Sequence, residues 1–150
     1  MKFLITGITG FAGPHLANLL HARGHEVYGL IRRTNGMESD IRDVVPDDVY
    51  EDITFVYGEL TNYRSLVTIF KDTQFDGVFH LAAQSHPPTS FRDPIGTMDT
   101  NVIGSAKFMG TLEPMVVRFV GMILFFLLIL MVLLRQRLMF ISKRDLQTGS

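Results

Sequence analysis

The 150-residue sequence predicts an α/β fold in which helices cover both faces of a parallel β-sheet. Short, continuous apolar runs recur along residues 1–112, as expected of strands that are buried on both sides. Segments with apolar residues at helical spacing stand between these runs. Strands that alternate with helices form βαβ units with right-handed crossovers, so the sheet is expected to be parallel and doubly wound.

The predicted elements follow a regular order along the chain. Strands are expected at 3–5, 27–31, 53–57 and 77–81, and the main helices at 14–24, 62–71 and 97–112. Pro14 suits a first helical turn, where its missing N–H has no partner to lose, and Gly24 suits a helix end. The apolar residues at helical spacing are Leu16, Leu19 and Leu20, then Leu66, Ile69 and Phe70, then Val102, Ala106 and Met109.

Two connecting segments are expected to lack regular strands and long helices. Residues 34–52 are polar and acidic without a sustained period, which indicates a loop or a short irregular helix. Residues 82–94 are rich in proline and serine and are expected to form a loop.

Composition excludes several classes of site. A net charge of −1 argues against a nucleic-acid-binding surface, and the absence of cysteine excludes disulfides, thiolate chemistry and cysteine-based zinc sites. The apolar run that follows Lys2 is too short for a signal peptide, which favours a cytoplasmic protein. Of the five histidines, His15, His21 and His25 are expected to face solvent and His80 to lie satisfied in the core. None pairs with another at metal-ligand spacing, so no metal site is predicted.

A glycine-rich turn carries the strongest functional signal. Gly7, Gly10 and Gly13 directly follow the first strand and lead into a helix. This arrangement places backbone N–H groups and the positive end of a helix where a pyrophosphate can bind, and predicts a Rossmann-type dinucleotide site. The residues of the turn assigned to the cofactor are Gly7, Thr9, Gly10, Phe11, Ala12 and Gly13.

The end of the second strand indicates which dinucleotide is bound. A site for NAD usually has a carboxylate here, whereas Arg32 and Arg33 provide the positive charge that meets the 2′-phosphate of NADP. The sequence therefore favours NADP over NAD. A solvated basic turn is the alternative interpretation.

Five sequence strings, in the order and with the gaps expected, resemble the extended short-chain dehydrogenase/reductase superfamily, and within it the GDP-mannose 4,6-dehydratases. The strings are Ile5-Thr6-Gly7-Ile8-Thr9-Gly10, Ile31-Arg32-Arg33, Tyr57-Gly58-Glu59-Leu60-Thr61, Leu81-Ala82-Ala83-Gln84-Ser85-His86 and Asn101-Val102-Ile103-Gly104. The resemblance implies the front half of a Rossmann-type sheet, with strand order 3-2-1-4 and room for a fifth strand. It also implies a nucleotide-sugar substrate and a homo-oligomer in intact relatives.

Residue roles follow from the resemblance alone. Glu59 and Leu60 would flank the adenine, and Arg32 would meet the adenosine phosphate. Leu81, Ala82, Ala83, Gln84 and Ser85 would line the ribose and nicotinamide, with Ser85 and His86 on the substrate side. The family usually has aspartate at the position of Glu59 and often tyrosine at that of Gly96, so both contacts differ here.

The catalytic pair of the family is absent from these 150 residues. The reaction of the family that this sequence resembles needs a tyrosine as base, with a lysine four positions after it. The residues four positions after the tyrosines are Arg32, Thr54, Thr61 and Val67. No catalytic residue is therefore assigned, and the expected function is an NADP-binding fragment that does not turn over by itself.

Residues 113–150 break with this pattern and are treated as a separate tail. The run 119–134 is uncharged and apolar, and Arg135, Arg137, Lys143 and Arg144 follow it. Residues 115–120 fall where a fifth strand belongs. The favoured interpretation is a tail that no longer encodes the family, through truncation or a shifted frame. A membrane span at 116–134 and an apolar buried helix are the alternatives. The span would make the protein a membrane-tethered NADP-binding regulatory module, but the positive-inside rule would then place the cofactor domain outside.

Overall fold

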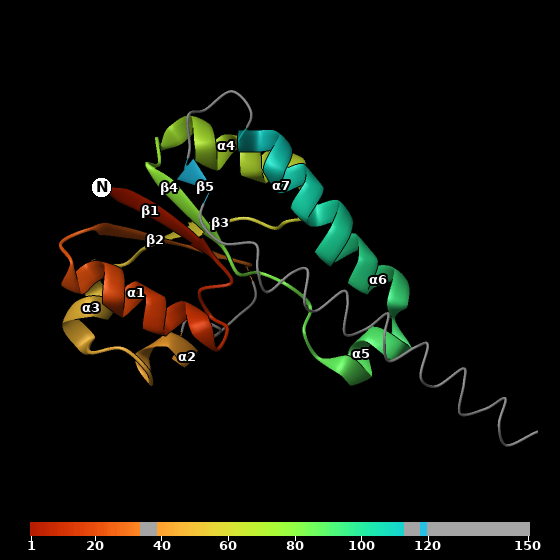
Figure 1. Ribbon diagram of the computed structural model, residues 1–150, viewed down its shortest axis with the longest axis horizontal. Helices are drawn as coiled ribbons and strands as arrows, with labels where there is room; N and C mark the ends of the chain where they lie inside the picture. Colours follow the sequence, from red (N-terminus) through yellow and green to blue (C-terminus); the bar gives the residue numbers. More distant parts are fainter. Residues whose placement is uncertain (34–38, 113–117, 120–150) are drawn as a thin grey trace, which may run out of the picture.

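A five-stranded parallel sheet organises the molecule (Figure 1). The computed structural model describes residues 1–33, 39–112 and 118–119. The strands are β1 (Lys2–Thr6), β2 (Glu26–Ile31), β3 (Thr54–Tyr57), β4 (Gly77–His80) and β5 (Arg118–Phe119), in the spatial order β3-β2-β1-β4-β5. The predicted order of the first four strands is confirmed. The fifth strand pairs in parallel with β4 where the sequence leaves room for it.

Helices connect the strands and complete a three-layer structure. They are α1 (Ala12–Ala22), α2 (Ser39–Arg42), α3 (Asp47–Asp52), α4 (Tyr63–Asp72), α5 (Pro87–Arg92), α6 (Pro94–Met98), the π-helix η1 (Asp99–Gly104) and α7 (Ser105–Leu112). Figure 1 shows α1, α2 and α3 on one face of the sheet and α4 with α7 on the other.

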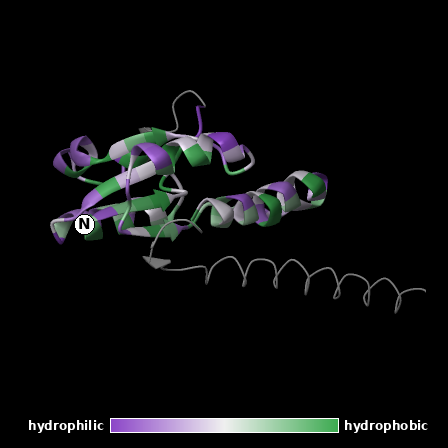
Figure 2. Cartoon of the chain, turned by 90° about the horizontal axis from the view of Figure 1, so that it is seen from above, coloured by the Kyte–Doolittle hydropathy of each residue, from purple (hydrophilic) through white to green (hydrophobic). Residues whose placement is uncertain are grey.

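Alternation along the strands divides the core between the two faces. On β1, Ile5 belongs to the cluster beneath α1 and α3, whereas Leu4 belongs to the cluster beneath α4 and α7. On β2, Ile31 and Leu30 divide in the same way. Because each face carries its own apolar layer, the middle of the strands is mainly apolar, as Figure 2 shows for the centre of the molecule. Polar residues such as Lys2, Glu26 and His80 stand at the strand ends.

Both connecting segments contain short helices, which agrees with the short irregular helix allowed for 34–52 but not with the loop predicted for 82–94. α2 and α3 form within 34–52, and Val49 of α3 is buried at 4% exposure against the α1 face. In 82–94, α5 begins at Pro87, and α6 begins at Pro94 rather than at residue 97. The prolines start these helices because a first turn needs no proline N–H.

The predicted apolar face of the last helical stretch was wrong. Its buried residues are Asn101, Gly104, Ser105, Phe108 and Thr111, whereas Ala106 and Met109 are exposed. A Cβ on Gly104 would lie 3.0 Å from the Leu60 Cβ, so the helix lies too close to Leu60 for a side chain at position 104. Leu19 of α1, also placed on a buried face, is 47% exposed. In α4, by contrast, Leu66, Ile69 and Phe70 are all buried as predicted.

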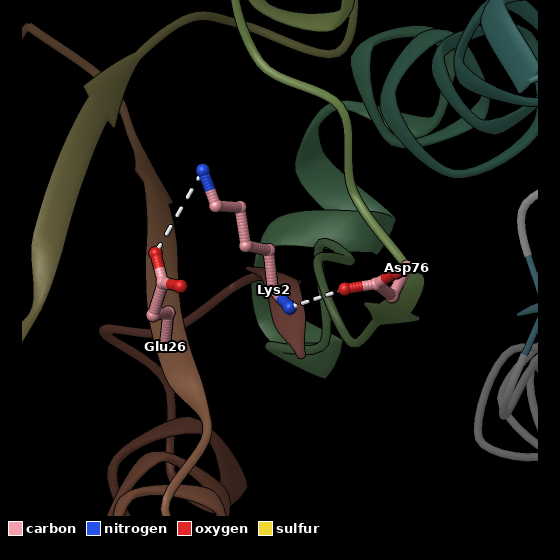
Figure 3. Close-up of polar contacts among 3 residues, drawn as sticks. All are labelled: Lys2, Glu26 and Asp76. Carbon is pink, nitrogen blue, oxygen red and sulfur yellow. Dashed lines mark hydrogen bonds and ion pairs between the residues drawn. The ribbon is translucent and has the colours of Figure 1, made fainter.

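Charged side chains hold the amino edge of the sheet together (Figure 3). The Lys2 backbone N–H donates to the Asp76 carboxylate at 2.6 Å, and the Lys2 Nζ lies 3.8 Å from the Glu26 carboxylate. These contacts join β1 to the starts of β2 and β4 at the edge away from the glycine-rich turn.

The apolar helix and the membrane span predicted at 116–134 lie outside the described residues, except for Arg118–Phe119, which form β5. Within the described part of the chain, every helix is too short or too polar to span a bilayer.

Candidate functional site

The residues predicted to bind a cofactor lie at the carboxyl edge of the sheet. Since all five strands are parallel, the segments that follow β1, β2, β3 and β4 emerge at this edge. The chain crosses from β1 to β2 on one face and from β4 to β5 on the other, which makes β1 and β4 the point where the connections diverge. Open α/β sheets bind their ligands in the crevice at such a point.

The surroundings of the three glycines in the turn after β1 differ, and so does the need for glycine at each position. Gly7 has φ +73°, and a Cβ there would lie 2.7 Å from the Ala82 backbone nitrogen. A Cβ on Gly13 would lie 2.5 Å from the Ile8 Cα. A Cβ on Gly10 would meet only the Gly7 carbonyl oxygen, at 3.2 Å. The fold itself therefore requires Gly7 and Gly13, while Gly10 leaves space at the surface of the turn.

The first turn of α1 presents its backbone to the space beside Gly10. The N-cap residue, Phe11, makes no side-chain capping bond, and its ring is 92% exposed beside His15. Ala12 is exposed, Thr9 is half-buried, and the Gly10 N–H closes the turn on the Gly7 carbonyl at 3.0 Å. Uncapped N–H groups at a helix start are donors suited to an anion.

The two arginines predicted to bind phosphate follow β2 and are exposed. The Arg33 guanidinium lies 5.8 Å from the ring centroid of Tyr57, at the end of the neighbouring strand β3. Arg33 and Tyr57 also line an open hollow of about 370 Å³ beside α4. The Gly58 N–H donates to the Ile31 carbonyl at 3.0 Å, which keeps the ends of β2 and β3 together.

The segment after β3 lies next to the arginines. Leu60 is buried at 7% exposure, whereas Glu59 is exposed and donates its backbone N–H to the Ser65 hydroxyl at 3.3 Å. The Lys107 ammonium of α7 donates to the Thr61 carbonyl at 2.7 Å. These contacts orient the predicted adenine side of the site.

The segment after β4 is held by an amide side chain that sequence analysis missed. Asn101 is 5% exposed, and its Oδ1 accepts the Gln84 N–H at 2.7 Å while its Nδ2 donates to the Gln84 carbonyl at 3.0 Å. Asn101 lies in the π-helix η1. Its Asn-x-x-Gly string was the only available signal, and nothing local reveals the partner.

The remaining predicted residues of this segment lie along its exposed side. Leu81, Ala82, Ala83 and Gln84 are half-buried, while Ser85 and His86 are exposed. His86 precedes α5, and its Nδ1 lies 3.0 Å from the Thr89 hydroxyl. The structure thus places Leu81 and Ala82 against the Gly7 turn, with Ser85 and His86 further out.

His80 is buried and has polar partners, as predicted. Its Nδ1 lies 2.6 Å from the Thr6 Oγ1, its Nε2 lies 2.9 Å from the Ser105 Oγ, and its ring stacks on Phe108 with centroids 4.7 Å apart. Burial removes water from the imidazolium and lowers the pKa of His80 from 6.5 to about 4. The ring is therefore neutral at neutral pH.

This pKa predicts that acid destabilises the domain through His80. Between pH 6.5 and 4 the unfolded imidazole binds a proton that the folded one does not, so the free energy of unfolding falls as the pH is lowered. The loss attributable to His80 is expected to reach about 3 kcal/mol at pH 4 and to vanish above pH 7. The free energy of unfolding, measured by urea denaturation across this pH range, should depend less steeply on pH in His80→Phe than in the original chain. Some dependence should remain in the variant because carboxylates titrate in both proteins. Equal slopes would contradict the assignment.

The other histidines are only partly as expected. His15 is exposed, but His21 and His25 are half-buried: the His21 Nε2 lies 2.8 Å from the Asp52 carboxylate, and the His25 ring packs edge-on against Phe3. Among the described residues, no three His, Asp or Glu side chains are grouped so that they could hold a metal ion.

Comparison with known proteins identifies the family. Residues 4–120 match the profile of the family described as GDP-mannose 4,6 dehydratase. The chain belongs to the GDP-mannose 4,6-dehydratase family. It is 38% identical over 122 residues to a GDP-mannose 4,6-dehydratase of Vibrio cholerae, and 36% identical over 110 residues to GDP-mannose 4,6 dehydratase 1 of Arabidopsis thaliana. These matches cover 79% and 71% of this chain but 31% and 30% of the two relatives.

Solved structures confirm the Rossmann-type fold of this family member. UDP-glucose 4-epimerase from Thermus thermophilus, in complex with NAD, has a TM-score of 0.63 and 28% identity, covering 76% of this chain and 34% of that protein. The Bordetella bronchiseptica enzyme WbmH, in complex with NAD+, has a TM-score of 0.60 and 30% identity, covering 75% and 35%. The chain thus spans about a third of the length of the proteins it matches.

Proposed function

We propose that residues 1–112 of this GDP-mannose 4,6-dehydratase family member bind a nicotinamide dinucleotide at the carboxyl edge of the sheet. The space at Gly10 carries this proposal. The fold explains why positions 7 and 13 are glycine, but a Cβ at position 10 would meet a single carbonyl oxygen. A pyrophosphate that approaches the turn closely would account for the third glycine.

The chemistry of the surrounding groups fits such a cofactor. The N–H groups at the start of α1 would hold the pyrophosphate, and Glu59 with Leu60 would flank the adenine. The half-buried segment from Leu81 to Gln84 would line the nicotinamide, which supplies hydride transfer when it is bound. The two hydrogen bonds between the Asn101 side chain and the Gln84 backbone, here called the Asn101 clamp, would keep that segment fixed against the nicotinamide ring.

The preferred form of the cofactor is proposed to be NADP(H). Arg32 and Arg33 are exposed directly after β2 and are available to a 2′-phosphate, and no carboxylate occupies the strand end that would accept the 2′-hydroxyl of NAD. The UDP-glucose 4-epimerase and WbmH structures are complexes with NAD, so they support a dinucleotide site rather than its phosphate selectivity.

Cofactor binding without turnover is the activity these residues support. The match covers 31% of a Vibrio cholerae relative named GDP-mannose 4,6-dehydratase, and we propose that a nucleotide sugar is the substrate of the complete enzyme type. The 150 residues lack a tyrosine followed by a lysine four positions on, so no residue here is assigned to deprotonate the sugar. We place the chain in the cytoplasm, where the coenzyme is available.

Isothermal titration calorimetry on the folded full-length chain tests the proposal. NADP+ is expected to bind at one site, with NAD+ binding at least about 10-fold more weakly, a difference of about 1.4 kcal/mol. Incubation with GDP-mannose and NADP+ is expected to give no dehydrated sugar. Binding of neither coenzyme by protein with an α/β circular dichroism spectrum would refute the proposal.

A further inference from the structure

A buried polar chain runs beneath the predicted nicotinamide side of the site. Thr6, His80 and Ser105 are 0%, 4% and 4% exposed, and they link β1, β4 and α7. None of the three has a role in the proposed contacts with cofactor. We propose that this chain positions the carboxyl end of β4 for the nicotinamide half of the cofactor, with Thr6 and His80 as positioning residues. The inference rests on the proposed function.

Of the two His80 tautomers that these contacts allow, we assign the one in which Thr6 donates to the ring. Its Oγ1 accepts the backbone N–H of Ala82 at 3.2 Å, so its own proton is available to the His80 Nδ1 at 2.6 Å. The neutral ring then carries its proton on Nε2 and donates it to the Ser105 Oγ at 2.9 Å. In this arrangement His80 orients the Thr6 hydroxyl so that a lone pair faces Ala82.

The segment beyond β4 depends on such side-chain support. The ladder between β1 and β4 ends with Thr6 opposite His80, and the two described residues of β5 pair with Gly77 and Val78. After His80, the backbone is held by the Leu81 N–H on the Thr6 carbonyl at 3.1 Å, by the Thr6 hydroxyl on Ala82, and by the Asn101 clamp on Gln84. The Thr6 hydroxyl is therefore the side-chain bond nearest to the turn.

Loss of this bond should act on one half of the cofactor. The Leu81 bond to Thr6 is between backbone groups, so it remains when either side chain is substituted. The adenine and the 2′-phosphate are proposed to lie toward β2 and β3, whereas Ala82 packs against the Gly7 turn, next to the proposed pyrophosphate. A displaced Ala82 should thus disturb nicotinamide contacts and spare those of the adenine and the 2′-phosphate.

Titration of matched variants with two probes tests this inference. Thr6→Val removes the hydroxyl with little change in shape, and His80→Phe retains the ring that stacks on Phe108. Both variants are expected to bind NADP+ about 5-fold to 10-fold more weakly than the original chain, as the loss of one hydrogen bond allows. Their affinity for 2′-phospho-ADP-ribose, which lacks the nicotinamide ring, is expected to stay within about 2-fold. Thr6→Ser, which retains a hydroxyl, should restore NADP+ binding.

A control variant separates this role from a merely structural one. Phe108→Leu weakens the same core without touching the hydrogen bonds, and it should lower the melting temperature while leaving the ratio of the two affinities unchanged. Equal weakening of both probes in Thr6→Val and His80→Phe, or no weakening of NADP+, would overturn the positioning role. If the original chain binds neither probe, the proposed function itself fails, which is a distinguishable result.

Discussion

Replacing Gly10 by valine is expected to abolish NADP(H) binding while the domain remains folded. A Cβ at this position meets only the Gly7 carbonyl oxygen, at 3.2 Å, so the turn needs to shift by a few tenths of an ångström at most. The branched side chain would instead project from the surface of the turn, where the pyrophosphate is proposed to lie. The dissociation constant for NADP+ should rise about 100-fold or more, which corresponds to about 3 kcal/mol.

The neighbouring glycines provide the contrast that gives this prediction its meaning. In Gly13→Ala, the new methyl group would lie 2.5 Å from the Ile8 backbone, which cannot move without displacing β1 from α1. That variant should therefore unfold or fail to accumulate. Gly110→Val is a matched control, because nothing lies within 4 Å of a Cβ there. Circular dichroism and calorimetry distinguish the outcomes, and unchanged affinity in folded Gly10→Val would show that the turn holds no pyrophosphate.

The strands were predictable because burial on both faces leaves a simple signal. Leu4 and Ile5 face opposite layers, so both must be apolar, and the run they form can be recognised without knowledge of its neighbours. The strand order followed from the resemblance to a Rossmann-type sheet. The glycine-rich turn was predictable for a similar reason, since its geometry depends on a contiguous stretch of chain.

The buried face of the last helical stretch was not predictable from apolar spacing. Close packing against Leu60 requires Gly104, and the polar partners of the site require Asn101 and Ser105 on the same face. A pattern search for apolar residues therefore selects the wrong side, with Ala106 and Met109 exposed. The contacts of Asn101 with Gln84 join residues 17 positions apart, and no local signal reports them.

Reversing the charge at Arg32 is expected to change the coenzyme preference. In Arg32→Asp, NADP+ would lose a charge-assisted hydrogen bond and gain a repulsive carboxylate near its 2′-phosphate, which together should weaken binding about 100-fold. NAD+ has no such phosphate, and its affinity should change by no more than about 3-fold. Arg32 is exposed, so the effect on NADP+ should shrink as salt is raised from low to physiological concentration.

A control variant shows whether the effect of Arg32→Asp on coenzyme preference is due to a specific contact with the 2′-phosphate. Arg23 is also exposed but lies at the end of α1, toward the amino edge of the sheet, so Arg23→Asp makes the same change in net charge far from the proposed site. If general electrostatic attraction explained NADP+ binding, both variants would weaken it alike. A specific 2′-phosphate contact requires that Arg23→Asp leave the ratio of NADP+ to NAD+ affinity intact. Equal loss of both coenzymes in Arg32→Asp would instead mean that the guanidinium supports the fold of the β2 end, and the preference for NADP would have to be abandoned.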